Sequence, residues 1–341
     1  MVNMSELFYV GGYQGQSKHC LYSYAYDNDA VHQLSTCEIP NASYLCFSQD
    51  KKFLYTVLES DNGKVASISL EDNGKMRVLN DKNTGGAYPC HLSVSKDGSA
   101  LYTANYGGGS SAIYNLLPSG EIGERKALVD HNTFGKASMA DPNRQEAPHA
   151  HYIVPVNKDG ITSAWVCDLG LDAVLIYNED GTEIARLNTP AGFGPRHLAF
   201  HHSMPHAYVL GELSCSVIDF GYDLKPSTEV PVLKENVDCT CAAIKIAPSG
   251  KFVLTSNREN NGGSISVLSL DETGKISGLK SVTPSGGICP RDFSFNTAGD
   301  KVFVAHQDSE DVVVFDWTED GTLVSSGLKF EVQRPTCVLF T

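Results

Sequence analysis

The segment Arg144–His151 carries two histidines, a carboxylate and a guanidinium within eight residues. Imidazole titrates near neutral pH, so a histidine in such a group is suited to general acid or base catalysis. His149 and His151 differ by two positions and would share one face of a strand. The alternative is that both are structural groups with satisfied hydrogen bonds. We predict His149 as the catalytic acid or base, His151 as a substrate contact, and Arg144, Gln145 and Glu146 as loop anchors or rim contacts.

Three of the eight arginines, Arg196, Arg258 and Arg291, lie at comparable places in an internal repeat. Guanidinium groups grip carboxylate or phosphate through paired hydrogen bonds. In a chain of net charge −14 such a cluster stands out, and it predicts binding of a small anionic molecule. The alternative is that each arginine pairs with a neighbouring carboxylate and ties adjacent repeats together.

The loops that follow the second strand of each repeat supply two more candidates. Glu212 lies in one of them, and we predict that it assists His149 in activating water. Tyr106 lies in another and is predicted to contact the substrate. The loop Asn105–Ser110 is glycine-rich, but a strand rather than a helix follows it, so it predicts a bend and not a phosphate-binding loop.

These residues must be positioned by a repeat of short apolar strands. Each is followed by a turn and a second strand rich in Tyr, Val and Thr, and then, after a polar bend, by a third strand. The opening strands are predicted at 44–47, 91–94, 151–154, 197–200, 243–246, 292–295 and 337–340. Register positions 45, 92, 152, 198, 244, 293 and 338 recur about every 45 residues, with one longer interval that contains Arg144–His151. This period, without helical periodicity, is typical of a β-propeller whose opening strands line a central channel.

Turn chemistry and the two chain ends complete the prediction. Hairpin turns are predicted at Gln49–Lys51, Lys96–Gly98, Lys158–Gly160, Pro248–Gly250 and Ala298–Asp300. The seventh opening strand ends the chain, and Leu7–Gly12 and Cys20–Tyr24 read as the strands that would follow it. We therefore predict an all-β, seven-bladed β-propeller, residues 1–341 as a single domain, in which the C-terminal strand completes the N-terminal blade and leaves no exposed edge.

Composition excludes several classes of protein. With 26 basic and 40 acidic side chains, the acidic surface disfavours nucleic acid and anionic membranes as partners. Met1–Leu7 does not begin a secretory signal, and no stretch reaches the length of a membrane span. The ten cysteines are scattered without paired C-x-x-C spacing, which predicts reduced thiols, a cytoplasmic location, and neither metal nor cofactor.

Seven motifs together resemble the lactonase family of seven-bladed propellers, which includes propeller-type 6-phosphogluconolactonase and fungal 3-carboxy-cis,cis-muconate lactonising enzyme. The motifs are Asn105–Ser110, Arg144–His151, Asp168–Asp172, Gly194–His197, Gly211–Leu213, Ser256–Arg258 and Pro290–Phe293. The resemblance implies a metal-independent enzyme acting on a lactone, with its site at the positions of His149, Arg196, Glu212 and Arg258. The chain departs from the usual pattern at Cys241–Ala243 and at Tyr152.

The leading hypothesis is hydrolysis of a small anionic lactone, 6-phospho-D-glucono-1,5-lactone, to 6-phosphogluconate of the pentose phosphate pathway. His149 would activate water, and the arginines would hold the phosphate and stabilise the oxyanion. A cycloisomerase acting on a substituted muconate is the second hypothesis, because the same scaffold hosts both reactions. A propeller that serves only as a binding platform is the third. The sequence predicts no particular oligomeric state.

Overall fold

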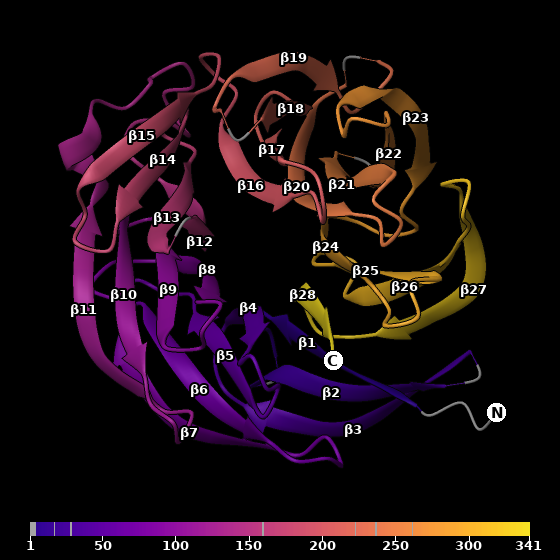
Figure 1. Cartoon of the computed structure of the whole chain (residues 1–341). Helices are drawn as coiled ribbons and strands as arrows, with labels where there is room; N and C mark the ends of the chain where they lie inside the picture. The colour runs from indigo at the N-terminus through magenta and orange to yellow at the C-terminus, as the bar shows by residue number, and fades with distance from the viewer. Residues whose placement is uncertain are drawn as a thin grey trace. The chain divides into compact units, whose positions relative to one another are not determined.

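The computed structural model describes residues 5–16, 18–27, 29–158, 160–221, 223–235, 237–260 and 262–341. Within these ranges the strands form seven four-stranded sheets (Figure 1), and the fold is the predicted all-β, seven-bladed propeller. The predictions made for Met1–Met4 and for Asp159 in one hairpin turn lie outside the described residues. The described residues include no helix long and apolar enough to span a membrane.

The chain divides into two compact units. The first comprises the described residues of Met1–Gly15, Tyr24–Gln33 and Arg196–Thr341. Three complete sheets follow one another in its sequence, each with its strands in chain order. They are β16 (Pro195–Phe200), β17 (His206–Gly211), β18 (Ser216–Gly221) and β19 (Pro226–Pro231); β20 (Cys239–Ile246), β21 (Phe252–Glu259), β22 (Ser264–Leu270) and β23 (Ile276–Pro284); and β24 (Pro290–Phe295), β25 (Lys301–His306), β26 (Asp311–Trp317) and β27 (Leu323–Glu331).

The second unit comprises the described residues of Gln16–Ser23 and Leu34–Pro195. Its three complete sheets are also ordered along the chain. They are β4 (Ala42–Phe47), β5 (Phe53–Leu58), β6 (Lys64–Leu70) and β7 (Met76–Asn83); β8 (Pro89–Val94), β9 (Ala100–Asn105), β10 (Ser110–Leu116) and β11 (Ile122–Asp130); and β12 (Ala150–Lys158), β13 (Ile161–Asp168), β14 (Ala173–Asn178) and β15 (Glu183–Asn188). The longer interval of the repeat contains an insertion, residues 131–149, between β11 and β12, and it begins with the 3-10 turn η1 (His131–Phe134).

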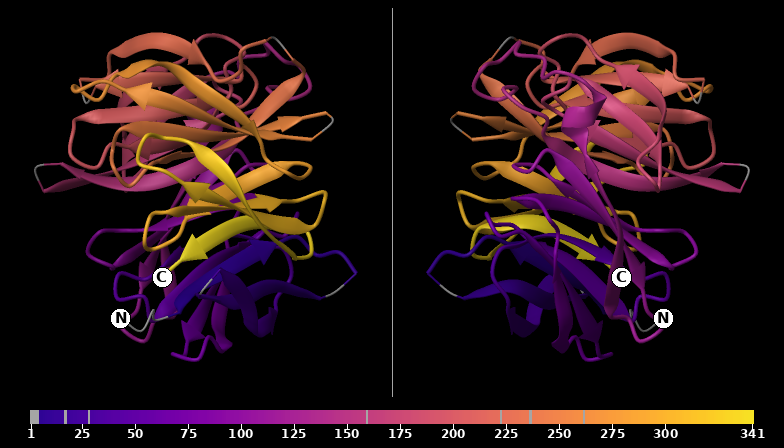
Figure 2. Two further views of the ribbon diagram at one scale, coloured as in Figure 1. Left: turned by 90° about the vertical axis from the view of Figure 1, so that its right-hand side faces the viewer. Right: turned by 90° about the vertical axis from the view of Figure 1, so that its left-hand side faces the viewer.

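The seventh sheet joins the two ends of the chain, as predicted. Its order is β28 (Pro335–Phe340), β1 (Glu6–Gly12), β2 (His19–Asp27) and β3 (Ala30–Glu38). β28 pairs antiparallel with β1, and Phe8 lies opposite Phe340. Figures 1 and 2 show this yellow C-terminal strand beside the indigo N-terminal one. The pairing satisfies backbone groups that β1 would otherwise expose along its edge.

All seven predicted opening strands are present, and each lies at one edge of its sheet. The strand at the opposite edge was not predicted in any repeat. Those outer strands are largely polar and exposed, as in β7 and β27, so they lack the apolar signal that marks a buried strand. The inner strands carry that signal strongly, and every residue of β9 is buried.

Neighbouring sheets pack face to face through large apolar side chains. In the second unit, Tyr102, Val166 and Leu175 belong to one core cluster between the β8–β11 and β12–β15 sheets. In the first unit, a second core cluster lies between the β20–β23 and β24–β27 sheets and includes Leu254, Phe293 and Val304. Burying such a side chain contributes about 1.5–3 kcal/mol. This packing makes the strand ends rigid supports for the loops that carry the candidate site.

Candidate functional site

His149 lies in the second unit, immediately before β12, and its side chain is 9% exposed. Its Nδ1 lies 2.9 Å from the backbone carbonyl of Tyr106. A carbonyl can only accept, so Nδ1 carries a hydrogen and donates it. That leaves Nε2 as the atom able to exchange a proton. Nε2 lies 3.1 Å from Oε1 of Glu146, and this contact is a hydrogen bond when Nε2 is protonated, because a carboxylate only accepts. The imidazole is therefore oriented by backbone on one side and paired with a carboxylate on the other.

The predicted substrate contacts Tyr106 and His151 lie beside His149. The Tyr106 ring stacks on the His149 ring, with centroids 4.4 Å apart and planes inclined by 14°. His151 meets the edge of Tyr106 at 5.5 Å, and Nη2 of Arg144 donates to the Tyr106 hydroxyl at 3.3 Å. The structure thus brings together three residues predicted from the sequence and adds Arg144 to the group.

The insertion is held by polar contacts that explain its local shape. The Gln145 side chain is fully buried, with Nε2 donating to the Leu169 carbonyl at 2.8 Å and Oε1 accepting from the Asp141 backbone at 3.1 Å. Gln145 is thus the loop anchor predicted from the sequence. Glu146, by contrast, contacts His149 directly, and its side chain is 51% exposed. It can therefore link the imidazole to solvent.

Asp168 and His131 form a buried support that sequence reasoning missed. Asp168 Oδ1 accepts from the backbone amides of His149 and Leu171 at 2.8 and 3.0 Å. Its Oδ2 lies 2.7 Å from Nδ1 of His131, and neither side chain is exposed. His131 Nε2 lies 3.3 Å from the Tyr177 hydroxyl. The pair was hard to predict because His131 stands 18 residues before His149 in an irregular segment.

In the first unit, Glu212 binds two of the predicted arginines. Its Oε2 lies 2.8 Å from Nε of Arg196, and its Oε1 lies 3.1 Å from Nη2 of Arg258. The side chains of Glu212 and Arg196 are each 3% exposed, and that of Arg258 is 15% exposed. Both carboxylate oxygens of Glu212 therefore face guanidinium groups. The three residues together carry one surplus positive charge.

Strand ends and backbone carbonyls place these arginines. Arg196 is the second residue of β16, and its Nη1 donates to the Ala242 carbonyl and to Nε2 of His197. Arg258 lies one residue before the end of β21 and donates to the carbonyls of Thr240 and Cys241 at 3.3 and 2.7 Å. The contacts between Glu212 and Arg258 join two neighbouring sheets, as the structural alternative predicted. The surplus charge equally fits the binding of an anion.

Arg291, the third predicted arginine, contacts an aromatic side chain. Its Nη2 donates to the Tyr13 hydroxyl at 3.0 Å, and its guanidinium lies 5.5 Å from the ring centroid. Arg334 lies over the same ring at 5.6 Å. Two cations therefore lie against the same aromatic ring.

Three cysteines also meet in the first unit. The Sγ atoms of Cys215, Cys239 and Cys241 all lie within 4.8 Å of one another. Hydrogen bonds from the Cys239 and Cys241 thiols, with a smaller contribution from the Arg258 charge, lower the pKa of Cys215 to about 4. Burial raises the pKa of Cys241. The one signal for this group in the sequence is the spacing of Cys239 and Cys241, which strand geometry places on one face.

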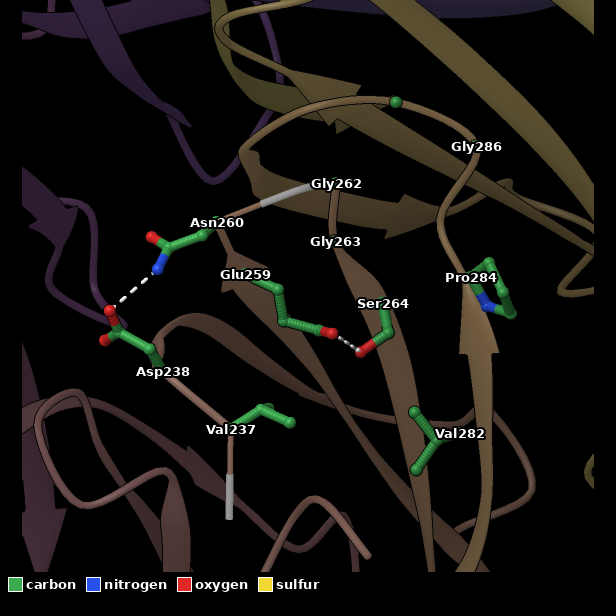
Figure 3. Close-up of a pocket in the computed structure, with 11 residues that line it drawn as sticks. Val237, Asp238, Glu259, Asn260, Gly262, Gly263, Ser264, Val282, Pro284 and Gly286 are labelled. Atoms are coloured by element: carbon green, nitrogen blue, oxygen red, sulfur yellow. Dashed lines mark hydrogen bonds between the residues drawn. The ribbon is translucent and has the colours of Figure 1, made fainter. Parts of the chain in front are cut away.

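A cavity of about 740 Å³ lies at one end of the β20–β23 sheet, and Figure 3 shows its lining. Its polar side chains are Asp238, Glu259, Asn260 and Ser264. Asp238 accepts from Asn260 at 2.7 Å, and Glu259 accepts from Ser264 at 2.6 Å. Two carboxylates repel an anionic ligand, and none of the predicted site residues lines this space. We therefore place the candidate chemistry at the histidine and arginine groups.

The loop Asp168–Asp172 is a structural bend between β13 and β14. Asp172 accepts from the backbone amides of Gly192 and Gly194, each at 2.7 Å, and from the Ser138 hydroxyl. Its carboxylate is therefore used to hold the chain that leads into β16.

The chain is similar over nearly its full length to known proteins of one family. The model of a family described as "Lactonase, 7-bladed beta-propeller" matches residues 7–340. A 6-phosphogluconolactonase of Bacillus subtilis is 28% identical, covering 97% of this chain and 97% of its own. An uncharacterised protein of Staphylococcus saprophyticus is 30% identical, covering 90% of each chain. The solved structure of the periplasmic gluconolactonase of Pseudomonas aeruginosa is 25% identical, with a TM-score of 0.91 and 99% of each chain covered.

Proposed function

Because the chain belongs to the lactonase family of seven-bladed β-propellers, we propose that it hydrolyses a small anionic lactone, with 6-phospho-D-glucono-1,5-lactone as the substrate. The relative from Bacillus subtilis bears the name of that activity. The observation that carries the proposal is the state of His149, whose Nδ1 is committed to a carbonyl while Nε2 is left for proton transfer.

The proposed reaction begins with water, which gives a proton to Nε2 of His149 as its oxygen attacks the lactone carbonyl. The resulting imidazolium is stabilised by the Glu146 carboxylate 3.1 Å away. When the tetrahedral intermediate collapses, the bond between the carbonyl carbon and the ring oxygen breaks. Nε2 then returns its proton to the leaving ring oxygen, and the product is an open-chain hydroxy acid.

Anion binding is assigned to the arginines. Arg196 and Arg258 carry one more positive charge than the Glu212 that they share. Burial strengthens the attraction of that surplus charge for a phosphate or carboxylate, because the local dielectric is lower than that of water. Glu212, expected from the sequence to assist in activating water, is better suited by these contacts to holding the two guanidinium groups in place.

The test is a lactone-hydrolysis assay on the purified chain, corrected for spontaneous opening. We expect His149→Ala to lower kcat by about 10²–10⁴-fold, the usual contribution of a general acid or base. His32→Ala is the matched control, since that imidazole is 61% exposed on β3. A wild-type rate for His149→Ala would remove the assignment.

Two further substrates separate the alternatives. Unphosphorylated glucono-1,5-lactone should react with a higher KM if the arginines bind phosphate, and Arg258→Ala should reduce the difference between the two lactones. A substituted muconate should not turn over. Loss of muconate absorbance would instead establish the cycloisomerase, and no turnover of any substrate would favour a binding platform.

A further inference from the structure

Cys215, Cys239 and Cys241 form a group that the proposed hydrolysis does not use. Cys215 lies in the turn between β17 and β18, and the other two lie at the start of β20. The three Sγ atoms fall within 4.8 Å of one another, although 24 residues of chain separate Cys215 from Cys239.

Backbone contacts hold the turn against β20 and so keep the three thiols together. The Cys241 amide donates to the Glu212 carbonyl at 3.0 Å, and the Val232 amide donates to the Cys215 carbonyl at 3.0 Å. The Cys215 thiol lies 3.0 Å from the Cys239 carbonyl. Because these contacts join consecutive sheets within one unit, the group is part of the folded scaffold and does not depend on a loose loop.

The backbone at Cys215 is unusual for this side chain. Its φ of 49° is left-handed, a region that favours Gly, Asn and Asp. The corresponding turns elsewhere place Gly109, Asp172 and Glu310 there, at φ of 52°, 48° and 55°. Asp172 uses its side chain to bind the following loop.

We propose that Cys215, Cys239 and Cys241 bind one thiophilic metal ion, with Zn²⁺ as the ion that fits best. Zinc–sulfur bonds of about 2.3 Å in a tetrahedral site place sulfurs about 3.8 Å apart, which small side-chain rotations reach from the observed separations. Thiolates do not suit Ca²⁺ or Mg²⁺, which prefer oxygen ligands. Cys215 and Cys239 are partly exposed, which leaves the ion a route of entry and an open fourth position.

The charge of the neighbouring arginine group also favours Zn²⁺ at the three cysteines. Zn²⁺ with three thiolates carries a net charge of −1, and the group of Arg196, Arg258 and Glu212 carries +1. Arg258 donates to the Cys241 carbonyl at 2.7 Å, so the two charged groups are directly connected. Backbone contacts and charged neighbours of this kind orient metal ligands and tune the bound ion.

The test measures metal content of the full-length chain. The protein is reduced, incubated with excess Zn²⁺ and freed of unbound metal by gel filtration. We expect about one Zn²⁺ per chain in the wild type, the number a single three-cysteine site would hold. Cys215→Ser and Cys239→Ser should each lose it. Cys289→Ser is the matched control, because Cys289 is also partly exposed and left-handed, at φ of 61°, but lies outside the group.

Cd²⁺ supplies a second readout, since thiolate coordination produces an ultraviolet charge-transfer band. The band should appear in the wild type and in Cys289→Ser, and it should weaken in Cys215→Ser even if circular dichroism shows an intact fold. Wild-type zinc content in Cys215→Ser would overturn the proposal. A reduced wild-type chain that binds no zinc would also overturn it. Formation of a Cys215–Cys239 disulfide in place of zinc binding would overturn it as well.

Discussion

The Glu212 carboxylate forms ion pairs with two guanidinium groups, and its side chain is only 3% exposed. These contacts differ in burial from an ordinary surface ion pair. Arg196 and Arg258 are fixed by backbone carbonyls as well as by this carboxylate. Such a group is costly to break, because removal of one partner leaves an uncompensated charge inside the protein. His149 is likewise fixed by a backbone contact. The Tyr106 carbonyl determines which ring nitrogen carries the hydrogen and which is available for proton transfer.

Glu212→Gln should therefore destabilise the protein far more than an equivalent change at the surface. We expect a loss of about 3–5 kcal/mol in the free energy of unfolding, as for other buried pairs that lose one charge. Glu183→Gln is the control, because Glu183 pairs with Arg186 at 2.8 Å with 34% of its side chain exposed. That change should cost at most about 1 kcal/mol. Denaturant titration of both variants decides the matter, and equal losses would contradict the buried-pair argument.

Hairpin turns are the elements that set the strand registers, and the predicted turns behave as their residues require. Gly98, Gly250 and Gly299 adopt φ of 74°, 70° and 76°, the left-handed conformation for which a glycine is suited. In the turn between β8 and β9, Asp97 accepts from the Ser95 hydroxyl at 2.6 Å and from the Ser99 amide at 3.1 Å. Its carboxylate thereby closes the hairpin.

These hydrogen bonds, that of Ser95 first, lower the pKa of Asp97 to about 2. The folded-state pKa lies below the unfolded value, so the stability that Asp97 contributes is present above the unfolded pKa of about 4 and is lost as pH falls towards 2. Asp97→Asn should reduce stability at about pH 6 and have less effect at about pH 2.5. Thermal unfolding at the two pH values measures this. Asp72→Asn, in another exposed turn, is the control, and a pH-independent effect of Asp97→Asn would contradict the prediction.

At the scale of the whole molecule, the chain ends are joined by β-sheet pairing. Phe340 of β28 stacks on Phe8 of β1 at 4.8 Å and meets Phe303 at 4.9 Å. The C-terminal strand thus contributes both a row of backbone hydrogen bonds and aromatic packing. Without it, β1 would present an unpaired apolar edge, which is a template for association with other chains.

Ending the chain after Arg334 should remove that protection. We expect the shortened protein to lose soluble yield and to associate, because Phe8 and Val10 would lose the strand that covers their backbone. Light scattering coupled to gel filtration detects the association. Phe340→Leu, which keeps the strand and an apolar side chain, should behave as the wild type. A shortened chain that has the wild-type elution volume and unfolding transition would show that the closure is dispensable.

The fold followed from local patterns that a sequence displays directly. Apolar strands, turn residues and a period of about 45 residues predicted the seven opening strands and the union of β28 with β1. The fourth strand of each sheet escaped prediction because a polar, exposed edge strand resembles a loop in sequence. The candidate residues His149, Tyr106, Arg196, Glu212 and Arg258 could also be selected from their chemical types and places in the repeat.

What only the tertiary structure decided was which atoms meet. The Tyr106 carbonyl that orients His149 is 43 residues away in the chain, and Asp168 reaches back to His131 across 37. The sharing of Glu212 by two arginines and the meeting of Cys215 with Cys239 depend on contacts between different sheets. Local sequence encodes strands and turns through backbone preferences and burial, whereas these pairings arise from strand register and sheet packing, which are set by the whole fold.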